Sequence, residues 1–139
     1  MAENYEKGTR SYTMSKVKGK DTKPELMVRK ALFALGFRFR KNDKRYPGCP
    51  DIVLPKYKTM IFVNGCFWHG HEICRGSRVP KSNIDYWKNK IGRNVQRDKE
   101  NYEALEKADW NVIILWECEL KRTLFENRIE QLVRQIKRD

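Results

Sequence analysis

The fold is decided by residues 50–69, which read PDIVLPKYKTMIFVNGCFWH. Two apolar runs, residues 51–54 and 59–63, stand on either side of a polar turn at 55–58. Short apolar runs bounded by turn residues are typical of buried strands, and a connection this short favours antiparallel pairing. We therefore expect a β-hairpin whose second strand is apolar enough to be central in a sheet.

The residues before the hairpin carry the signals of an amphipathic helix. Thr22 can act as its N-cap, Pro24 lies in its first turn, and Gly36 can end it. Between them, apolar residues recur at helical spacing, namely Val28, Leu32 and Leu35. Residues 37–40 then alternate apolar with basic, which indicates a half-buried strand.

After the hairpin, residues 64–81 show no period and are expected to form a loop. A helix is predicted from Asn83, carrying Trp87 and Ile91. We expect a break after it and then a second helix through Tyr102 and Leu105.

The C-terminal part of the chain predicts one more strand and one more helix. Residues 111–116 form an apolar run typical of a buried strand. Residues 124–138 predict an amphipathic helix with an apolar face of Leu124, Ile129, Leu132 and Ile136. The fold class that follows is α/β, a mixed sheet flanked by helices.

Charge indicates the class of partner. The 139 residues hold 30 Lys and Arg against 18 Asp and Glu, which gives a net charge of +12. Such a basic small domain favours a polyanion, nucleic acid first, and a surface that is basic only for solubility is the alternative. Residues 1–20 are polar and basic, so we expect an arm that is mobile without DNA, ahead of a single domain at 21–139.

Nothing in the composition favours a membrane. No stretch approaches the roughly 18 apolar residues of a spanning helix, and the first residues lack the apolar core of a secretory signal. We therefore expect a cytoplasmic protein. In that reducing compartment its four cysteines are more often reduced, metal-bound or catalytic than paired as disulfides.

The loop after the hairpin is rich in zinc-ligand types. Cys66, His69, His71 and Cys74 fall within nine residues, and Cys118 follows a predicted strand. Structural zinc takes four nitrogen or sulfur ligands, and a loop too polar to form a core gains order by folding around it. Cys66, His71, Cys74 and Cys118 make a closed set, although His69 could replace His71, and free buried thiols are the alternative.

Two carboxylates near the hairpin are candidates for chemistry. Asp51 opens a strand, where a nuclease can use it to hold a metal at the scissile phosphate, but an Asp after Pro50 is also a common turn residue. Glu25 stands three residues after Thr22, and a capping box explains that spacing equally well.

The remaining polar candidates lie further along the chain. His69 can be a general base, since histidine as a residue type titrates near neutral pH, or a plain surface imidazole. Asp98 can help to hold water near a metal or can pair with Arg97.

Three aromatic residues stand in or near the polar loop. Large apolar side chains can act as wedges between the base steps of a duplex. Phe67, Trp68 and Trp87 are candidates for this role. Packing against the zinc loop is the alternative, and for Trp87 core packing is the more common role of a tryptophan at helical spacing.

Taken together, these residues resemble the very short patch repair (Vsr) DNA mismatch endonucleases over nearly the whole chain. The resemblance rests on Thr9-Arg10-Ser11, Asp21-Thr22 with Glu25, PGCPD at 47–51, IFVNGCFWH at 61–69, KIGRNVQRD at 90–98 and WEC at 116–118. It implies a restriction-endonuclease-like α/β fold with a structural zinc loop.

The resemblance also implies roles for the site residues. Asp51 and the backbone carbonyl of Val63 would hold Mg²⁺ at the scissile phosphate, and His69 would activate water. Asn94 and Asp98 match positions that organise the waters around the magnesium.

Further residues match the family's structural and DNA-contacting positions. Glu25 matches a residue near the active centre. The zinc ligands correspond to Cys66, His71, Cys74 and Cys118, with a segment from His71 to Cys74 that is one residue longer than in the best-known members. The intercalating aromatics correspond to Phe67, Trp68 and Trp87.

Two departures qualify the resemblance. Asn64 stands where the best-known members have a histidine beside the phosphate, so a weaker phosphate contact is expected there. The Glu-x-Lys of restriction folds is missing after the second strand, an absence that the family shares.

The implied activity is a single-strand nick on the 5′ side of the thymine of a T:G mismatch left by deamination of 5-methylcytosine. The implied partners are double-stranded DNA containing a mismatch and downstream repair proteins, with a monomeric enzyme associated with the nucleoid. The alternatives are a zinc-containing DNA-binding module without nuclease activity, and a nickase with another mismatch or site preference.

Overall fold

The computed structural model describes residues 22–66, 69–71 and 81–138. Its main elements are α2 (Lys23–Ala34), β1 (Arg40–Lys41), β2 (Ile52–Leu54), β3 (Thr59–Asn64), α3 (Ile84–Lys107), β4 (Asn111–Trp116) and α4 (Phe125–Lys137). Two 3-10 turns, η1 (Pro55–Tyr57) and η3 (Glu117–Leu120), follow β2 and β4. The mixed α/β class is confirmed, whereas the N-terminal arm expected at 1–20 lies outside the described residues.

The four strands form one sheet in the order β1-β2-β3-β4. The predicted hairpin is present, since β2 and β3 pair antiparallel. β4 pairs with β3 in parallel, which places Val63 opposite Leu115 and Asn64 opposite Trp116. Parallel pairing needs a crossover between the strands, and α3 provides it. The C-terminal ends of β3 and β4 therefore lie side by side.

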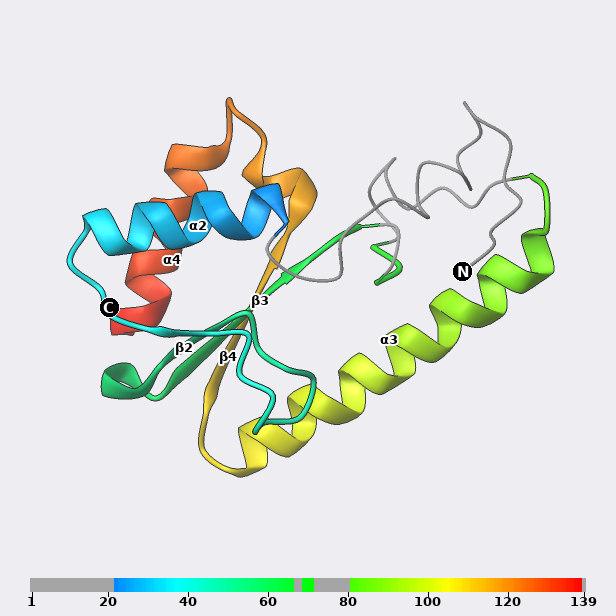
Figure 1. The fold of residues 1–139 in the computed structure, drawn as a ribbon, viewed down its shortest axis with the longest axis horizontal. Helices are drawn as coiled ribbons and strands as arrows, with labels where there is room; N and C mark the ends of the chain where they lie inside the picture. The colour runs from blue at the N-terminus through cyan, green and yellow to red at the C-terminus, as the bar shows by residue number, and fades with distance from the viewer. Residues whose placement is uncertain (1–21, 67–68, 72–80, 139) are drawn as a thin grey trace.

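Helices cover both faces of the sheet (Figure 1): α2 and α4 lie together on one face, and α3 runs along the other. The alternation of side chains along each strand explains the two cores. The core under α2 and α4 contains Ile52, Leu54, Ile61, Val63, Ile113 and Leu115 of the strands, with Val28, Leu32, Ile129, Leu132 and Ile136 of the helices. The core under α3 contains Val53, Met60 and Phe62 with Leu105, and Tyr102 packs against it.

The break predicted between two helices is wrong, because Ile84–Lys107 is one continuous helix of 24 residues. A glycine inside a helix costs only about 1 kcal/mol relative to alanine, so Gly92 does not end it. Trp87, Ile91 and Leu105 are buried along its length. The free energy gained by burying these side chains exceeds the unfavourable helix propensity of Gly92.

The strand predicted at residues 37–40 is also largely wrong, since only Arg40–Lys41 pairs with β2. Gly36 adopts a positive φ of 94°, and the backbone N–H of Phe37 donates to the carbonyl of Leu32 at 3.0 Å. The chain there is closing the end of α2, although Phe37 is buried as an apolar residue.

The C-terminal helix begins at Phe125, and Leu124, which was expected on its buried face, is 50% exposed. The other predicted apolar positions of this helix are buried. None of the helices within residues 22–66 and 81–138 combines the length and the apolar character that a bilayer crossing needs.

We predict that Ile61→Ala lowers the free energy of unfolding by about 2–5 kcal/mol, because a fully buried strand residue leaves a cavity when it is truncated. Leu124→Ala is the matched control and should change stability by less than about 0.5 kcal/mol, since its side chain is half exposed. Urea unfolding measures both. Equal losses of unfolding free energy in the two variants would show that Ile61 is not a core residue.

Candidate active site

Asp51 directly precedes β2 and lies beside the C-terminal part of β3. Its backbone N–H donates to the carbonyl of Ile61 at 3.1 Å, which extends the hairpin by one residue. Its carboxylate Oδ2 accepts the backbone N–H of Val63 at 2.6 Å. The Asp51 carboxylate is thus fixed beside Val63, near the C-terminal end of β3.

Glu25 comes to the same place from the first turn of α2. It is only 3% exposed, and its Oε2 accepts a hydrogen bond from Arg29 Nη2 at 2.8 Å. The Thr22 side chain makes no capping hydrogen bond, so the capping box does not explain this glutamate. Sequence reasoning missed Arg29, although its spacing of four residues from Glu25 is that of a helical ion pair.

The two carboxylates influence each other. The pKa of Asp51 is raised to about 7, mainly by burial; the charge of Glu25 and a hydrogen bond between the two side chains add to the rise, whereas the Val63 N–H and Arg29 oppose it. Carboxylate oxygens are the ligands that Mg²⁺ and other hard cations prefer. A cation at Asp51 would relieve this repulsion, so the donor set fits a divalent metal.

A histidine and an aspartate form a second pair, between the segment after β3 and helix α3. His69 Nδ1 lies 2.5 Å from Asp98 Oδ2, and the backbone N–H of His69 donates to the carbonyl of Gly65. Asp98 therefore pairs with His69 and not with its neighbour Arg97. A carboxylate at Nδ1 fixes the ring orientation and leaves Nε2 as the nitrogen that can take a proton. Asn94, one turn earlier on α3, is half-buried.

The cysteines and the second histidine form a separate cluster. Ligand atoms of Cys66, His71 and Cys118 lie within 4.8 Å of one another, and Cys118 Sγ is 3.4 Å from His71 Nδ1. Sulfur and nitrogen ligands of a tetrahedral zinc lie roughly 3.5 Å apart, so these donors fit one ion. Cys74, the expected fourth ligand, lies outside the described residues. His71 belongs to the cluster, and His69 does not.

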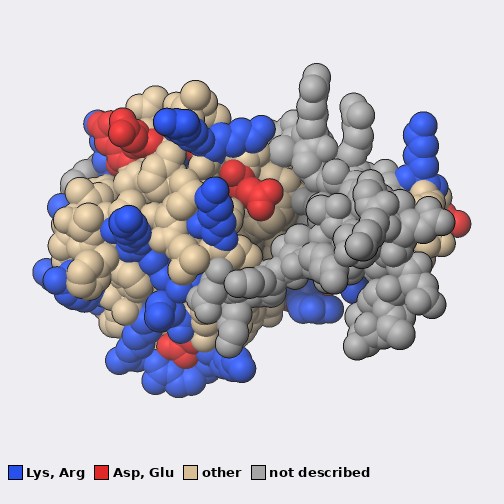
Figure 2. Space-filling model, turned by 45° about the horizontal axis from the view of Figure 1, so that its top comes forward, with Lys and Arg blue, Asp and Glu red and all other residues tan. Residues whose placement is uncertain are grey.

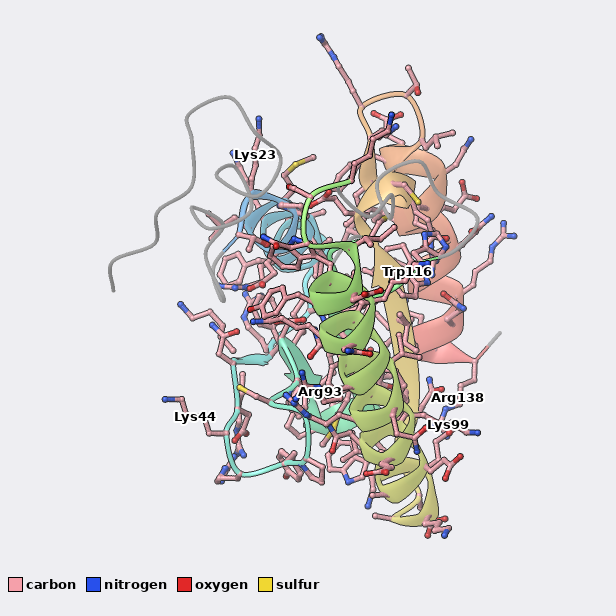
Figure 3. The ribbon with its side chains drawn as sticks, turned by 90° about the vertical axis from the view of Figure 1, so that its right-hand side faces the viewer. Lys23, Lys44, Arg93, Lys99, Trp116 and Arg138 are labelled. Atoms are coloured by element: carbon pink, nitrogen blue, oxygen red, sulfur yellow. The ribbon has the colours of Figure 1, made fainter. Side chains whose placement is uncertain are left out.

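The cluster depends on the sheet. Cys66 follows β3 and Cys118 follows β4, so the parallel pairing of these strands brings the two thiols together. The backbone N–H of His71 donates to the Cys66 carbonyl at 3.0 Å, and the His71 ring stacks on Trp116 at a centroid distance of 4.1 Å and an interplanar angle of 5°. Figure 3 shows Trp116 at the end of its strand.

Gly70 connects the two histidine sites. Its φ is 61°, and a Cβ built on it would lie 2.8 Å from Val95 Cγ2 and 3.0 Å from Ile91 Cγ2. Only glycine fits this approach of the loop to α3. The close packing holds His69 against Asp98 of α3 while His71 stays in the cysteine cluster. The glycine was not singled out from the sequence, where the flanking histidines drew attention.

The residues predicted to contact DNA do not form one group in the structure. Asn64 is 3% exposed, and its Nδ2 donates to Tyr102 Oη at 2.8 Å. Trp87 is buried on α3 with its ring edge-on to Tyr86. Phe67 and Trp68 lie outside the described residues. Tyr102 was missed as a polar residue because its helical spacing suggested a core position.

Basic side chains are spread widely over the surface. Lys and Arg residues are spread over the face seen in Figure 2, with few acidic residues between them. Figure 3 shows that they come from separate elements, with Arg93 and Lys99 on α3, Lys44 after β1 and Lys23 on α2. Such a surface attracts the phosphates of a nucleic acid.

Comparison with known proteins agrees with the geometry. The profile of the family described as DNA mismatch endonuclease Vsr matches residues 2–75. The type II nicking enzyme V.NmeAIP of Neisseria meningitidis serogroup A is 52% identical over 138 residues, which cover 99% of this chain and 98% of that protein. The DNA mismatch endonuclease Vsr of Escherichia coli K12 is 40% identical over 121 residues, 87% of this chain and 77% of that protein.

The class that fold, site and relatives define is that of DNA endonucleases, which hydrolyse phosphodiester bonds. Within it, the chain belongs to the Vsr DNA mismatch endonuclease family and is a nicking endonuclease. The reading of the chain as an inert zinc-containing DNA-binding module is therefore wrong.

We predict that the purified protein carries about one zinc per chain and that Cys118→Ser and His71→Ala lose it and melt at lower temperature. Cys49→Ser is the matched control, because Cys49 is outside the cluster. Metal analysis by mass spectrometry and thermal melting provide the readouts. If His69→Ala lost zinc and His71→Ala retained it, His69 would be the zinc ligand and His71 would not.

A further prediction concerns stability without added metal. The pKa of Asp51 is about 7 in the folded protein against an ordinary value of 3.8. Below about pH 4 the carboxyl is protonated in both the folded and the unfolded state. Between about pH 4 and 7 the unfolded state releases its proton first, so stability falls as pH rises, and above about pH 7 the loss is complete.

Asp51→Asn removes this loss while keeping an oxygen that can accept the Val63 N–H. In EDTA the variant should melt about 3–8 °C above the parent protein at pH 8 and at nearly the same temperature at pH 4. If the difference in melting temperature between variant and parent were the same at pH 4 and pH 8, Asp51 would be ionised in the folded protein at both pH values.

Proposed function

We propose that this protein makes a Mg²⁺-dependent single-strand nick on the 5′ side of the thymine of a T:G mismatch, in repair of deaminated 5-methylcytosine. The observation that carries the proposal is the pairing of Asp51 with Glu25 and of His69 with Asp98 at one end of β3. The relative from Escherichia coli is named a DNA mismatch endonuclease, which supports a mispaired substrate.

In this mechanism the Asp51 carboxylate and the Val63 carbonyl would hold the magnesium. When bound, the cation neutralises charge on the phosphate and on the leaving oxygen. The buried carboxylate of Glu25, held by Arg29, adds negative charge beside Asp51 and strengthens its affinity for a cation. Asn94 and Asp98 present polar groups from α3 that orient water.

His69 is the general base. Its Nε2 accepts a proton as water attacks the phosphorus, and the bridging P–O bond on the far side breaks. Asp98 accepts the Nδ1–H and stabilises the imidazolium that forms. Asp98 is therefore a positioning group for His69 as well as a polar group near the metal.

Recognition of the mismatch is assigned to the aromatic residues. Phe67, Trp68 and Trp87 would unstack the mispaired step, which costs less energy at a mismatch than in paired DNA. The buried Trp87 would need to contact the duplex through the edge of its ring or to support the other two. The basic surface supplies affinity that does not depend on sequence.

The cysteine cluster is proposed to hold structural zinc. Cys66, His71 and Cys118 would be joined by Cys74, and the ion would hold the loop that carries His69. Residues 1–20 would form an arm that orders on DNA, and residues 21–139 a single monomeric domain. The enzyme would act in the cytoplasm on the nucleoid and pass nicked DNA to downstream repair proteins.

The substrate is tested with a panel of duplexes that contain each mismatch in several sequence contexts. We expect nicking of T:G duplexes with Mg²⁺, on the thymine strand, and none in EDTA. Perfectly paired duplexes of the same sequence are the control. Faster nicking of another mismatch, or of paired DNA, would assign the enzyme a different target.

The catalytic roles predict different losses. Asp51→Asn should abolish nicking yet still bind DNA, because the metal is lost and one negative charge near the phosphates is removed. His69→Ala should slow nicking by about a hundred- to ten-thousand-fold and recover partly at higher pH, where hydroxide replaces the base. Single-turnover rates and DNA-binding titrations measure these effects. Parent-like nicking by Asp51→Asn would remove Asp51 from the mechanism.

A further inference from the structure

The hydrogen bond between Asn64 and Tyr102 is not used by the mechanism above. Asn64 ends β3, directly after Val63, and its side chain is almost fully buried. Its Nδ2 donates to Tyr102 Oη at 2.8 Å across 38 residues of chain. An amide so deeply buried is poorly placed to contact DNA itself, but it fixes the position of the tyrosine hydroxyl.

The tyrosine ring is held from a second side. Phe62 of β3 meets it edge to face at a centroid distance of 4.9 Å. Tyr102 also lies one helical turn after Asp98 on α3, so both side chains leave the helix on the same face. The hydroxyl is thus fixed by a strand contact, a helix and a hydrogen bond.

The hydroxyl lies near both proposed catalytic pairs. Its partner Asn64 directly follows Val63, whose N–H binds Asp51, and Asp98, which binds His69, precedes Tyr102 by one helical turn. Burial raises the pKa of Tyr102, and the negative charges of Asp98 and Asp51 add to the rise. The phosphate to be cleaved must reach the metal side at Asp51 and the base side at His69. Tyr102 is therefore close to the position between them.

The hydrogen-bonding capacity of the pair then decides its role. A phenol has one hydrogen to donate, and its oxygen can accept. Because Asn64 donates to that oxygen, the Tyr102 hydrogen is directed to a different acceptor. Phosphate oxygens are strong acceptors of such a bond.

We propose that the Tyr102 hydroxyl donates a hydrogen bond to a non-bridging oxygen of the cleaved phosphate, and that Asn64 is the positioning residue that aims it. Tyr102 is then a catalytic residue that favours the transition state without adding a charge. The inference rests on the proposed function, since it places the phosphate between Asp51 and His69.

The test compares Tyr102→Phe with the parent protein in single-turnover nicking. The substrate is the duplex that the parent nicks fastest in the mismatch panel, so a preference other than T:G overturns the proposed function but leaves this test intact. Duplexes with sulfur in place of each non-bridging oxygen at the nick, the Rp and Sp phosphorothioates, are measured in parallel. Tyr57→Phe is the matched control, because that tyrosine lies in η1 at the opposite end of the hairpin.

We expect Tyr102→Phe to nick about ten- to a hundred-fold more slowly at saturating DNA, with affinity for the duplex unchanged and a lower melting temperature, because the buried Asn64 amide loses its acceptor. For one of the two phosphorothioates, sulfur should slow Tyr102→Phe less than it slows the parent protein, by the same factor. Sulfur is a poor hydrogen-bond acceptor, so in the parent it weakens the bond that Tyr102→Phe has already lost. Asn64→Ala should slow nicking in the parent and have no further effect in Tyr102→Phe. Tyr57→Phe should nick at the parent rate.

Two results would overturn the inference. The first is parent-like nicking by Tyr102→Phe. The second is an equal loss on the normal and both sulfur substrates, which would mean that the hydroxyl donates to Asn64 or another protein group and is only structural.

Discussion

The parallel pairing of β3 with β4 is the constraint on which both sites depend. It sets Val63 opposite Leu115 and Asn64 opposite Trp116, so the residues that follow the two strands emerge together. Cys66 and Cys118 meet for this reason, and the backbone N–H groups of His69 and His71 bind the carbonyls of Gly65 and Cys66 just after β3. The buried apolar residues on both faces of these strands supply the free energy that keeps them paired.

The carboxylates at the proposed catalytic end of the sheet lower the stability of the fold. Two carboxylates, the buried Glu25 and the half-buried Asp51, lie within hydrogen-bonding reach of each other, and the Val63 N–H and Arg29 oppose their repulsion. Such an arrangement persists because the hairpin and α2 fix its members independently. A site that is unfavourable when empty binds a cation more strongly, since the ion relieves repulsion that the fold already holds in place.

Much of the fold could be predicted from the sequence, because the hairpin and the β4 segment are continuous apolar runs and the C-terminal helix carries apolar residues at helical spacing. The break in α3 was wrong because local propensity around Gly92 is weak beside the burial of Ile91 and Leu105. The family motifs contain Asp51, His69 and Asp98, which the structure places near the end of β3, and their roles stay proposals. Arg29 and Tyr102 escaped prediction because their roles depend on which helix face meets the sheet, which no single segment reveals.

The continuity of α3 has a consequence for how this enzyme can vary. Asn94, Asp98 and Tyr102 recur every four residues along one uninterrupted helix, so one rigid body delivers three polar groups to the same place. Inserting or deleting a single residue within that span would turn everything beyond it by about 100° and remove part of the set from the site. A substitution at one of these positions leaves the other two in place, whereas a change in the number of residues between them does not. The continuous helix therefore fixes the spacing of the three polar groups.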